Sequence, residues 1–250
     1  QARIVPTEID LLFESDSYVP PFYEGRAVPS AGTLLRLEAI PRFKRPNGSF
    51  VATNDIIFTW KRGGSVISSA SGRGRATVSL ESPGLFGSDL ISVEARTPDG
   101  KFSGSASARV TPTEPRLLLY KDHPLFGVMY HQALAPQFTG LVAQNFIPET
   151  EMSFAAVPYF AGAVDANDGR LIYAWRINGN DIANDPSRPS QITINAERSS
   201  GNALIELALS HATNFFMSSF GRWGVTLAGG NGGGTSGGSG AKDPFGGPAQ

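Results

Sequence analysis

The sequence predicts an all-β protein made of two β-sandwiches in series. Apolar and polar residues alternate with the two-residue period of a strand along most of the chain, and no stretch shows a convincing helical period. One set of sequence landmarks occurs twice, about 110 residues apart. The chain is also rich in turn-forming residues, with 29 glycines and 18 prolines. Short strands separated by glycine and proline are typical of sandwiches.

The repeat predicts the division of the chain. Four landmarks recur in the same order: residues 6–8 match 112–114, residues 39–43 match 156–160, residues 58–61 match 173–176, and residues 91–95 match 204–208. The first two landmarks lie further apart in the second copy, which predicts an insertion near residues 133–148. We therefore expect one sandwich over residues 1–111 and another over 112–228. Residues 229–250 are glycine-rich, so a flexible tail is expected there.

The alternation places the strands. In the first unit, strands are expected near residues 11–13, 35–39, 56–61, 76–80, 91–96 and 101–110, with a short strand after Trp60. Residues 97–100, Thr-Pro-Asp-Gly, predict the turn between the last two, because proline restricts φ and glycine accepts a positive φ. In the second unit, strands are expected near residues 117–120, 152–156, 171–177, 191–195, 203–210 and 222–227, with a short strand after Trp175.

Each unit contains a strand that ends in tryptophan and is followed by a tight turn and a second short strand. Trp60 and Trp175 occupy these positions. The pattern resembles strands C and C′ of immunoglobulin-like domains, in which the strand-C tryptophan fills the core. The cysteine pair of that family is absent, so the closer similarity is to cysteine-free immunoglobulin-like and PKD-like domains of bacterial surface proteins. The resemblance implies two tandem immunoglobulin-like sandwiches with Trp60 and Trp175 in their cores.

The whole chain also looks like secreted proteins of candidate-phylum bacteria, a resemblance that implies a location and no activity. The first residue is Gln1 and not methionine, as expected after removal of a signal peptide; a shortened chain is the alternative. We therefore expect an exported protein, outside the cell or on its surface.

Composition excludes several functions. Charged residues make up 17% of the chain, compared with about 25% in an average soluble protein, and the net charge is −1. This balance argues against a broad basic surface for nucleic acid. No apolar run approaches the roughly 20 residues of a membrane-spanning helix. The absence of cysteine excludes a disulfide framework, a thiol nucleophile and a thiolate zinc site.

Candidate chemistry is sparse. Residues 165–169, Asp-Ala-Asn-Asp-Gly, carry closely spaced oxygen ligands of the kind that Ca²⁺ takes. An Asx-rich hairpin turn is the preferred interpretation, because the segment directly precedes the Trp175 strand. His123, His131 and His211 are far apart, and no GxSxG nucleophile motif is present. We predict no catalytic residue, no metal site, no cofactor and no enzyme, and keep an active site hidden in residues 133–148 as a remote alternative.

A partner surface is the better prediction. Three loops contain many apolar residues: the insertion at 133–148, the segment 215–223, and residues 18–23. The candidate partner-binding residues are Phe138, Leu141, Phe146, Phe215, Phe216 and Phe220. Large exposed apolar patches usually mark interfaces, where aromatic residues are enriched. The alternative is that these loops fold back over the ends of the sandwiches or over the joint between them.

The sequence therefore favours a non-catalytic structural or interaction protein of the cell surface, such as a subunit of a surface layer or appendage. Its partner would be a protein, with self-association as one option. The alternative is a carbohydrate-binding or adhesin module that stacks sugar rings on the aromatic loop 215–223, so a glycan partner stays open.

Overall fold

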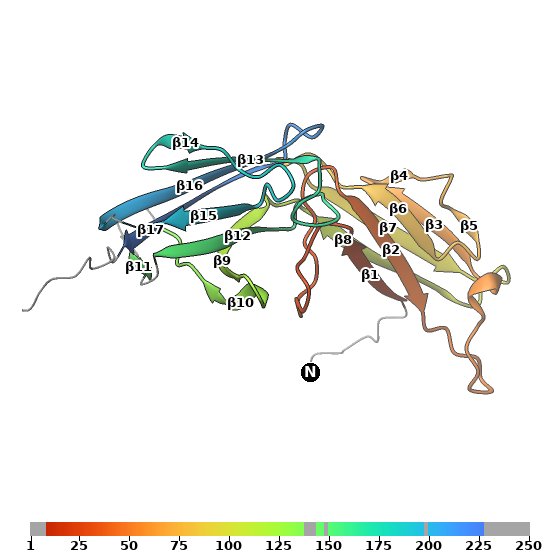
Figure 1. The fold of residues 1–250 in the computed structure, drawn as a ribbon. Coiled ribbons are helices and arrows are strands. Elements are labelled where there is room, and N and C mark those ends of the chain that lie inside the picture. Colours follow the sequence, from red (N-terminus) through yellow and green to blue (C-terminus); the bar gives the residue numbers. More distant parts are fainter. Residues whose placement is uncertain (1–8, 138–143, 148–149, 198–199, 228–250) are drawn as a thin grey trace, which may run out of the picture.

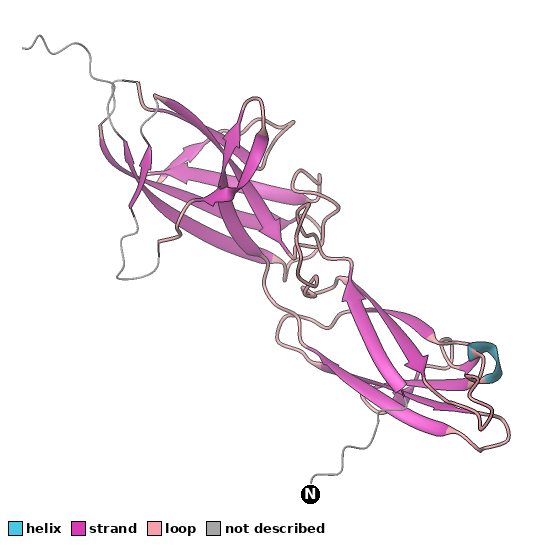
Figure 2. Ribbon diagram, turned by 90° about the horizontal axis from the view of Figure 1, so that it is seen from below, coloured by secondary structure: helices cyan, strands magenta, loops and turns pink. Residues whose placement is uncertain are grey.

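The computed structural model describes residues 9–137, 144–147, 150–197 and 200–227 of the 250-residue chain. Its strands form two groups, and each group encloses its own apolar core. Figures 1 and 2 show the two groups arranged end to end, with loops gathered between them. The described residues include no helix with the length and apolar character needed to span a membrane. The predicted tail at 229–250 lies outside the described residues.

The first group is a sandwich of two antiparallel sheets. One sheet has the order β1 (Ile9–Ser15), β2 (Leu34–Pro41), β6 (Thr77–Glu81). The other has the order β4 (Ser65–Val66), β3 (Ile57–Arg62), β7 (Asp89–Arg96), β8 (Ser103–Val110), and β5 (Gly72–Arg73) also pairs with β3. A short 3₁₀ helix at Thr53–Asp55 precedes β3.

Strand alternation builds this core. On β2, Leu35 and Leu37 are buried, while Arg36 between them and Glu38 after them are exposed. Trp60 on β3 is fully buried, and its indole N–H donates a 2.9 Å hydrogen bond to the carbonyl oxygen of Arg75. Gly100 takes a φ of 68° in the turn between β7 and β8, as the Thr-Pro-Asp-Gly sequence predicts.

The second group is also a two-sheet sandwich. One sheet has the order β10 (Gly127–Ala133), β9 (Arg116–His123), β12 (Glu151–Tyr159), β15 (Gln191–Asn195). The other has the order β11 (Gln144–Ile147), β17 (Ser218–Leu227), β16 (Gly201–His211), β13 (Leu171–Ile177), β14 (Asn180–Ile182). Trp175 on β13 is buried and donates a 3.0 Å hydrogen bond to the carbonyl oxygen of Pro189.

The protein is therefore all-β and consists of two immunoglobulin-like sandwiches in tandem, as the sequence predicts. The two-residue β5 and the strands β10 and β11 were not expected. Part of the predicted insertion forms β11, which pairs in parallel with the outer edge of β17. β11 pairs with a strand that is distant in the sequence, and local alternation does not indicate such a partner.

Candidate interaction surface at the joint between the sandwiches

The loop between β1 and β2, residues 16–33, passes from the first sandwich into the second. The amide of Tyr18 donates a 2.7 Å hydrogen bond to the carbonyl oxygen of Ala161, and the amide of Phe160 donates a 2.6 Å bond to the carbonyl oxygen of Tyr18. The Tyr18 ring packs against the core of the second sandwich, and burial raises the pKa of its hydroxyl to about 12. A loop of the first unit thus completes the packing of the second.

Further contacts connect the two sandwiches at the joint between them. The side-chain amide of Asn214 donates a 2.6 Å hydrogen bond to the carbonyl oxygen of Ala31. The ring of Tyr23 makes edge contacts with the rings of Tyr159 and Phe160, at centroid distances of 5.8 and 5.9 Å. These contacts tie three loops together, so packed side chains and hydrogen bonds set the relation between the sandwiches.

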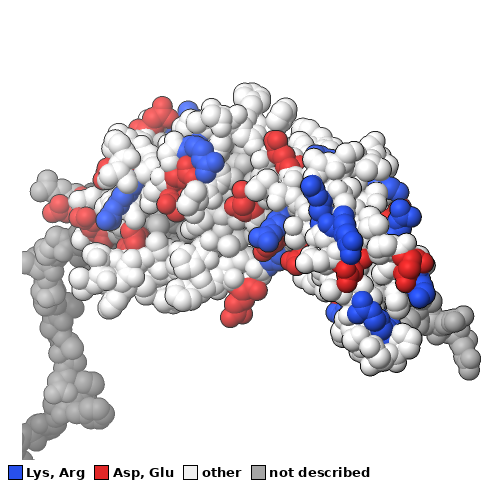
Figure 3. Space-filling view, turned by 90° about the vertical axis from the view of Figure 1, so that its right-hand side faces the viewer, with Lys and Arg blue, Asp and Glu red and all other residues white. Residues whose placement is uncertain are grey.

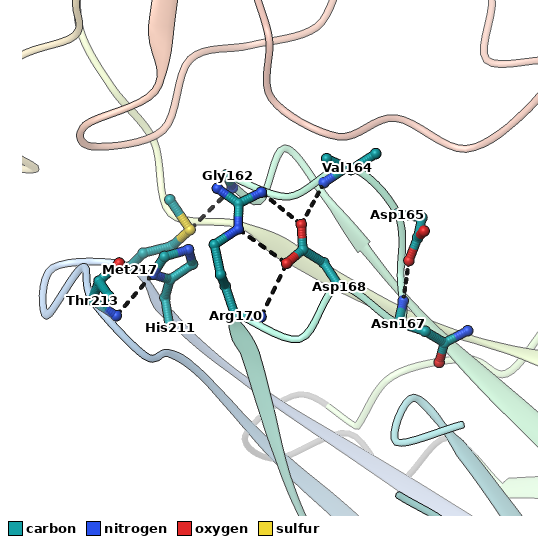
Figure 4. A network of polar contacts seen from close by, with 9 residues as sticks. All are labelled: Gly162, Val164, Asp165, Asn167, Asp168, Arg170, His211, Thr213 and Met217. Carbon is teal, nitrogen blue, oxygen red and sulfur yellow. Dashed lines mark hydrogen bonds and ion pairs between the residues drawn. The ribbon is translucent and has the colours of Figure 1, made fainter. Parts of the chain in front are cut away.

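The loop between β12 and β13 carries the predicted calcium-binding candidate (Figure 4). The Asp168 carboxylate accepts hydrogen bonds from the Arg170 guanidinium at 2.6 and 3.0 Å and from the amide of Val164 at 2.8 Å. Arg170 holds the pKa of Asp168 well below its usual value. Asp165 accepts a hydrogen bond from the amide of Asn167. The segment forms Asx turns, and no group of three or more acidic, histidine or cysteine side chains that could hold a metal ion occurs among the described residues.

The three histidines make only local hydrogen bonds among the described residues. The Nδ1 atom of His211 accepts hydrogen bonds from the amides of Thr213 and Asn214, and that of His123 accepts one from the amide of Leu125. The Nε2 atom of His131 lies 3.2 Å from the side-chain amide of Gln132. Each ring therefore bonds to residues close to it in sequence.

A hollow of about 530 Å³ opens beside the joint. Tyr18, Pro20 and Pro21 line it from the β1–β2 loop, and Val128 and Tyr130 line it from β10. Among the described residues that line the hollow, Asp165 is the only charged one. The hollow is thus a mostly apolar site formed by both sandwiches.

The structure separates the predicted partner-binding residues. Phe215, Phe216 and Phe220 are exposed, and so is Phe146. β11, which carries Phe146, pairs with the C-terminal end of β17, whereas Phe216 precedes its N-terminal end. A ten-residue strand spans about 33 Å, so these side chains belong to two distant surfaces. Phe138 and Leu141 lie outside the described residues.

The segment 215–223 is not one aromatic loop. It continues into β17, and Met217 and Trp223 are buried in the second core. No pattern in the sequence singles out Phe86, which is 95% exposed between β6 and β7. Its only signal would have been a large aromatic residue between Gly84 and Gly87 in a turn-rich segment.

Charge is dispersed over the face of the molecule that Figure 3 draws. Figure 3 shows lysines and arginines interspersed with aspartates and glutamates, without a continuous patch of either sign on that face. Surface ion pairs such as Lys61 with Glu94 account for part of this pattern. The surface in this view therefore lacks the basic stripe of a nucleic-acid-binding protein.

No protein-family model and no curated protein matches the chain. Among solved structures, it is similar to the three N-terminal domains of the bacteriophage RB49 highly immunogenic outer capsid protein (Hoc), with 12% identity, a TM-score of 0.43, and coverage of 89% of this chain and 59% of that one. The mouse nectin-like molecule 4 ectodomain (Ig1–Ig3) gives 11% identity, a TM-score of 0.31, and coverage of 89% and 64%. Fibronectin(III)-like modules of Clostridium thermocellum CbhA give 14% identity, a TM-score of 0.28, and coverage of 86% of this chain and 93% of that one. The chain thus spans less than two thirds of the first two structures, and likeness at these identities concerns the fold alone. The class that the fold defines is a tandem immunoglobulin-like protein.

Proposed function

We propose that this chain is a non-catalytic structural or interaction protein that works outside the cell or on its surface, as a subunit of a surface layer or an appendage. The observation that carries the proposal is the exposure of large aromatic side chains: Phe22, Phe86 and Phe215 are each more than 90% exposed. Such side chains are enriched in the energetic centres of protein interfaces.

The hydrogen-bonded joint between the sandwiches also supports a structural role. A subunit with a fixed angle between its sandwiches presents its contact surfaces in a constant relation, which lowers the entropy cost of assembly. The hydrogen bonds of Tyr18 and Asn214 across the joint supply this constraint.

The test is the state of the purified full chain in solution. Light scattering over a dilution series, with electron microscopy of the concentrated sample, should reveal assembly into dimers or larger filaments or sheets. A persistent monomer at the highest attainable concentration would contradict the proposal.

A carbohydrate-binding module is the second candidate. Phe215 and Phe216 lie side by side with ring centroids 6.3 Å apart, and both are exposed. Because Trp223 is buried, any sugar would stack on these two rings and Phe220. An affinity gel and a glycan array, with Phe215→Ala as the matched control, test this alternative. Absence of binding at millimolar sugar removes it.

A further inference from the structure

We propose that Tyr23 and Tyr159 are a site of oxidative cross-linking, at which a carbon–carbon bond between the ortho carbons of the two phenol rings joins the sandwiches covalently. Tyr23 belongs to the β1–β2 loop of the first sandwich, and Tyr159 is the last residue of β12 in the second. The bond forms within one copy of the chain, so the inference goes beyond the proposed assembly and does not depend on it.

The tyrosines of this chain are gathered at the joint. The sequence has six, and five of them form a continuous series of contacts there. The hydroxyl oxygens of Tyr120 and Tyr159 lie 2.8 Å apart, and the ring centroids of Tyr120 and Tyr130 lie 5.4 Å apart. Tyr130 is hydrogen-bonded to Tyr18, and Tyr23 meets Tyr159 at the other end of the series. Phenols, which lose an electron and a proton readily, are therefore concentrated where the sandwiches meet.

Tyr23 and Tyr159 are in ring-to-ring contact across the joint. Their centroids are 5.8 Å apart and their planes are inclined at 72°, which is an edge-on contact. The pKa of Tyr159 is raised by burial, by its hydrogen bond with Tyr120, and by electrostatic interaction with the phenols of Tyr120 and Tyr23. The hydroxyl ends of the pair are thus close enough to interact, and the reactive ortho carbons adjoin those ends.

The backbone beside each ring is unusual. Phe22, which precedes Tyr23, and Phe160, which follows Tyr159, both have a φ of 66°, a left-handed conformation that is costly for a residue with a side chain. A Cβ atom at Gly25 would overlap the Tyr23 hydroxyl, so a larger residue there would displace the ring. Such outliers cluster at functional sites, and rings held in contact react much faster than free ones.

The pair combines access for an oxidant with an acceptor for a proton. Tyr23 is 36% exposed, so an oxidant reaches it from solvent and its phenolic proton passes to water. Tyr120 is only 5% exposed, and its hydroxyl lies 2.8 Å from that of Tyr159. It can therefore accept the Tyr159 proton as the electron leaves.

The step is a two-electron oxidation overall. A one-electron oxidant, such as the haem centre of a peroxidase acting with hydrogen peroxide, removes one electron and the phenolic proton from each ring. The two phenoxyl radicals pair their electrons in the bond between the ortho carbons. The hydrogen on each of these carbons leaves as a proton, while each oxygen regains one. The chain loses two hydrogen atoms in all, and hydrogen peroxide takes up the two electrons and two protons to give two molecules of water.

The bond would stabilise the joint. The sequence contains no cysteine, so a disulfide cannot link these loops. A covalent link between positions 23 and 159 restricts the unfolded chain over a long loop, which is the main way in which disulfide cross-links stabilise a fold. The oxidised chain should therefore melt at a higher temperature than the untreated chain.

Oxidation of the full chain in dilute solution tests the site. One sample is treated with a haem peroxidase and hydrogen peroxide, and another with a light-activated ruthenium complex and persulfate, a small one-electron oxidant. We expect dityrosine fluorescence, an intact mass lower by two hydrogen atoms, and a peptide pair that joins Tyr23 to Tyr159. Digestion with trypsin and a glutamate-specific protease separates Tyr159 from Tyr130, because Glu151 lies between them.

Phenylalanine variants identify the pair. Tyr23→Phe and Tyr159→Phe keep the ring and remove the phenol, so each should stay folded by near-ultraviolet circular dichroism and lose the cross-linked peptide at least tenfold. Tyr18→Phe, the matched control in the same loop, should leave the peptide unchanged. A product that joins other tyrosines, a product that persists in either variant, or no intramolecular product with either oxidant would overturn the proposal.

Discussion

The carbonyl oxygen of Tyr18, in the first sandwich, accepts a 2.6 Å hydrogen bond from the amide of Phe160 in the second. The Tyr18 ring packs against the same core that Trp175 and Trp223 fill. The second sandwich therefore depends on a loop of the first unit, whose Tyr18 lies 142 positions before Phe160 in the sequence (160 − 18 = 142).

Tyr18→Ala should destabilise the second sandwich selectively. Loss of a partly buried ring costs about 2–4 kcal/mol, and the loss falls on the second core although the residue belongs to the first unit. Calorimetry should resolve an early transition for the second sandwich ahead of the first. Tyr18→Phe, which keeps the ring, is the control. A wild-type curve for Tyr18→Ala would contradict this account of the joint.

Trp60→Ala and Trp175→Ala should each unfold, or nearly unfold, their own sandwich. Truncating a buried tryptophan costs about 3–5 kcal/mol, against about 5–15 kcal/mol of total stability for a domain. Thermal melts followed by circular dichroism measure the effect. An unchanged melting temperature for either variant would show that its indole does not support the core.

Trp60→Phe should be more damaging than Trp223→Phe. Both indoles are fully buried, so the loss of volume is similar. The indole N–H of Trp60 donates to the carbonyl oxygen of Arg75, whereas that of Trp223 has no hydrogen-bond partner among the described residues. We expect a difference of about 1 kcal/mol in the free energy of unfolding, measured by denaturant titration. Equal losses would indicate that the Trp60 hydrogen bond contributes nothing net.

Asp168 should make stability depend on pH. Arg170 holds the folded-state pKa of Asp168 below its ordinary value of 3.8, so the ionised carboxylate favours the folded state. This contribution is complete above about pH 5 and is lost as the pH falls through the ordinary value towards the lower folded-state pKa. Asp168→Asn should cost about 1 kcal/mol at pH 7, because Arg170 is half exposed, and should flatten the acid side of the stability profile. Denaturant titrations at pH 7 and pH 3 measure both effects; parallel profiles would contradict the assignment.

Calcium should leave the protein unchanged. Val164 and Arg170 already donate to the carboxylate oxygens of Asp168, and Asn167 donates to Asp165. A bound ion would stabilise the folded state and raise the melting temperature. Melts with millimolar Ca²⁺ and with a chelator should coincide. A calcium-dependent shift that Asp165→Asn abolishes would reinstate the metal site.

The local alternation of apolar and polar residues was sufficient to predict the long strands. β2 and β13 alternate buried and exposed residues over their length, so their inward faces are evident from the sequence. β11 escaped notice because its four residues pair in parallel with β17, which is distant in sequence. The sequence predicts that β17 begins near residue 222, because the aromatic residues around Phe216 and Phe220 suggest a single loop. The strand in fact begins at Ser218.

The candidate site was accessible to sequence reasoning only in part. Residues 18–23 stood out as an apolar, proline-rich loop, but nothing in the sequence indicates that Tyr18 meets Ala161. The hydrogen bond from Asn214 to Ala31 joins residues 183 positions apart. No periodicity carries information over such separations.

The sequence by itself determined the all-β class, the duplication and the burial of Trp60 and Trp175, because strand alternation and a bulky ring in a strand are local properties. Only the tertiary structure decided that the β1–β2 loop bonds to the second sandwich and leaves the Phe22 ring exposed. The physical reason is that these features depend on contacts between three loops that are far apart in the sequence.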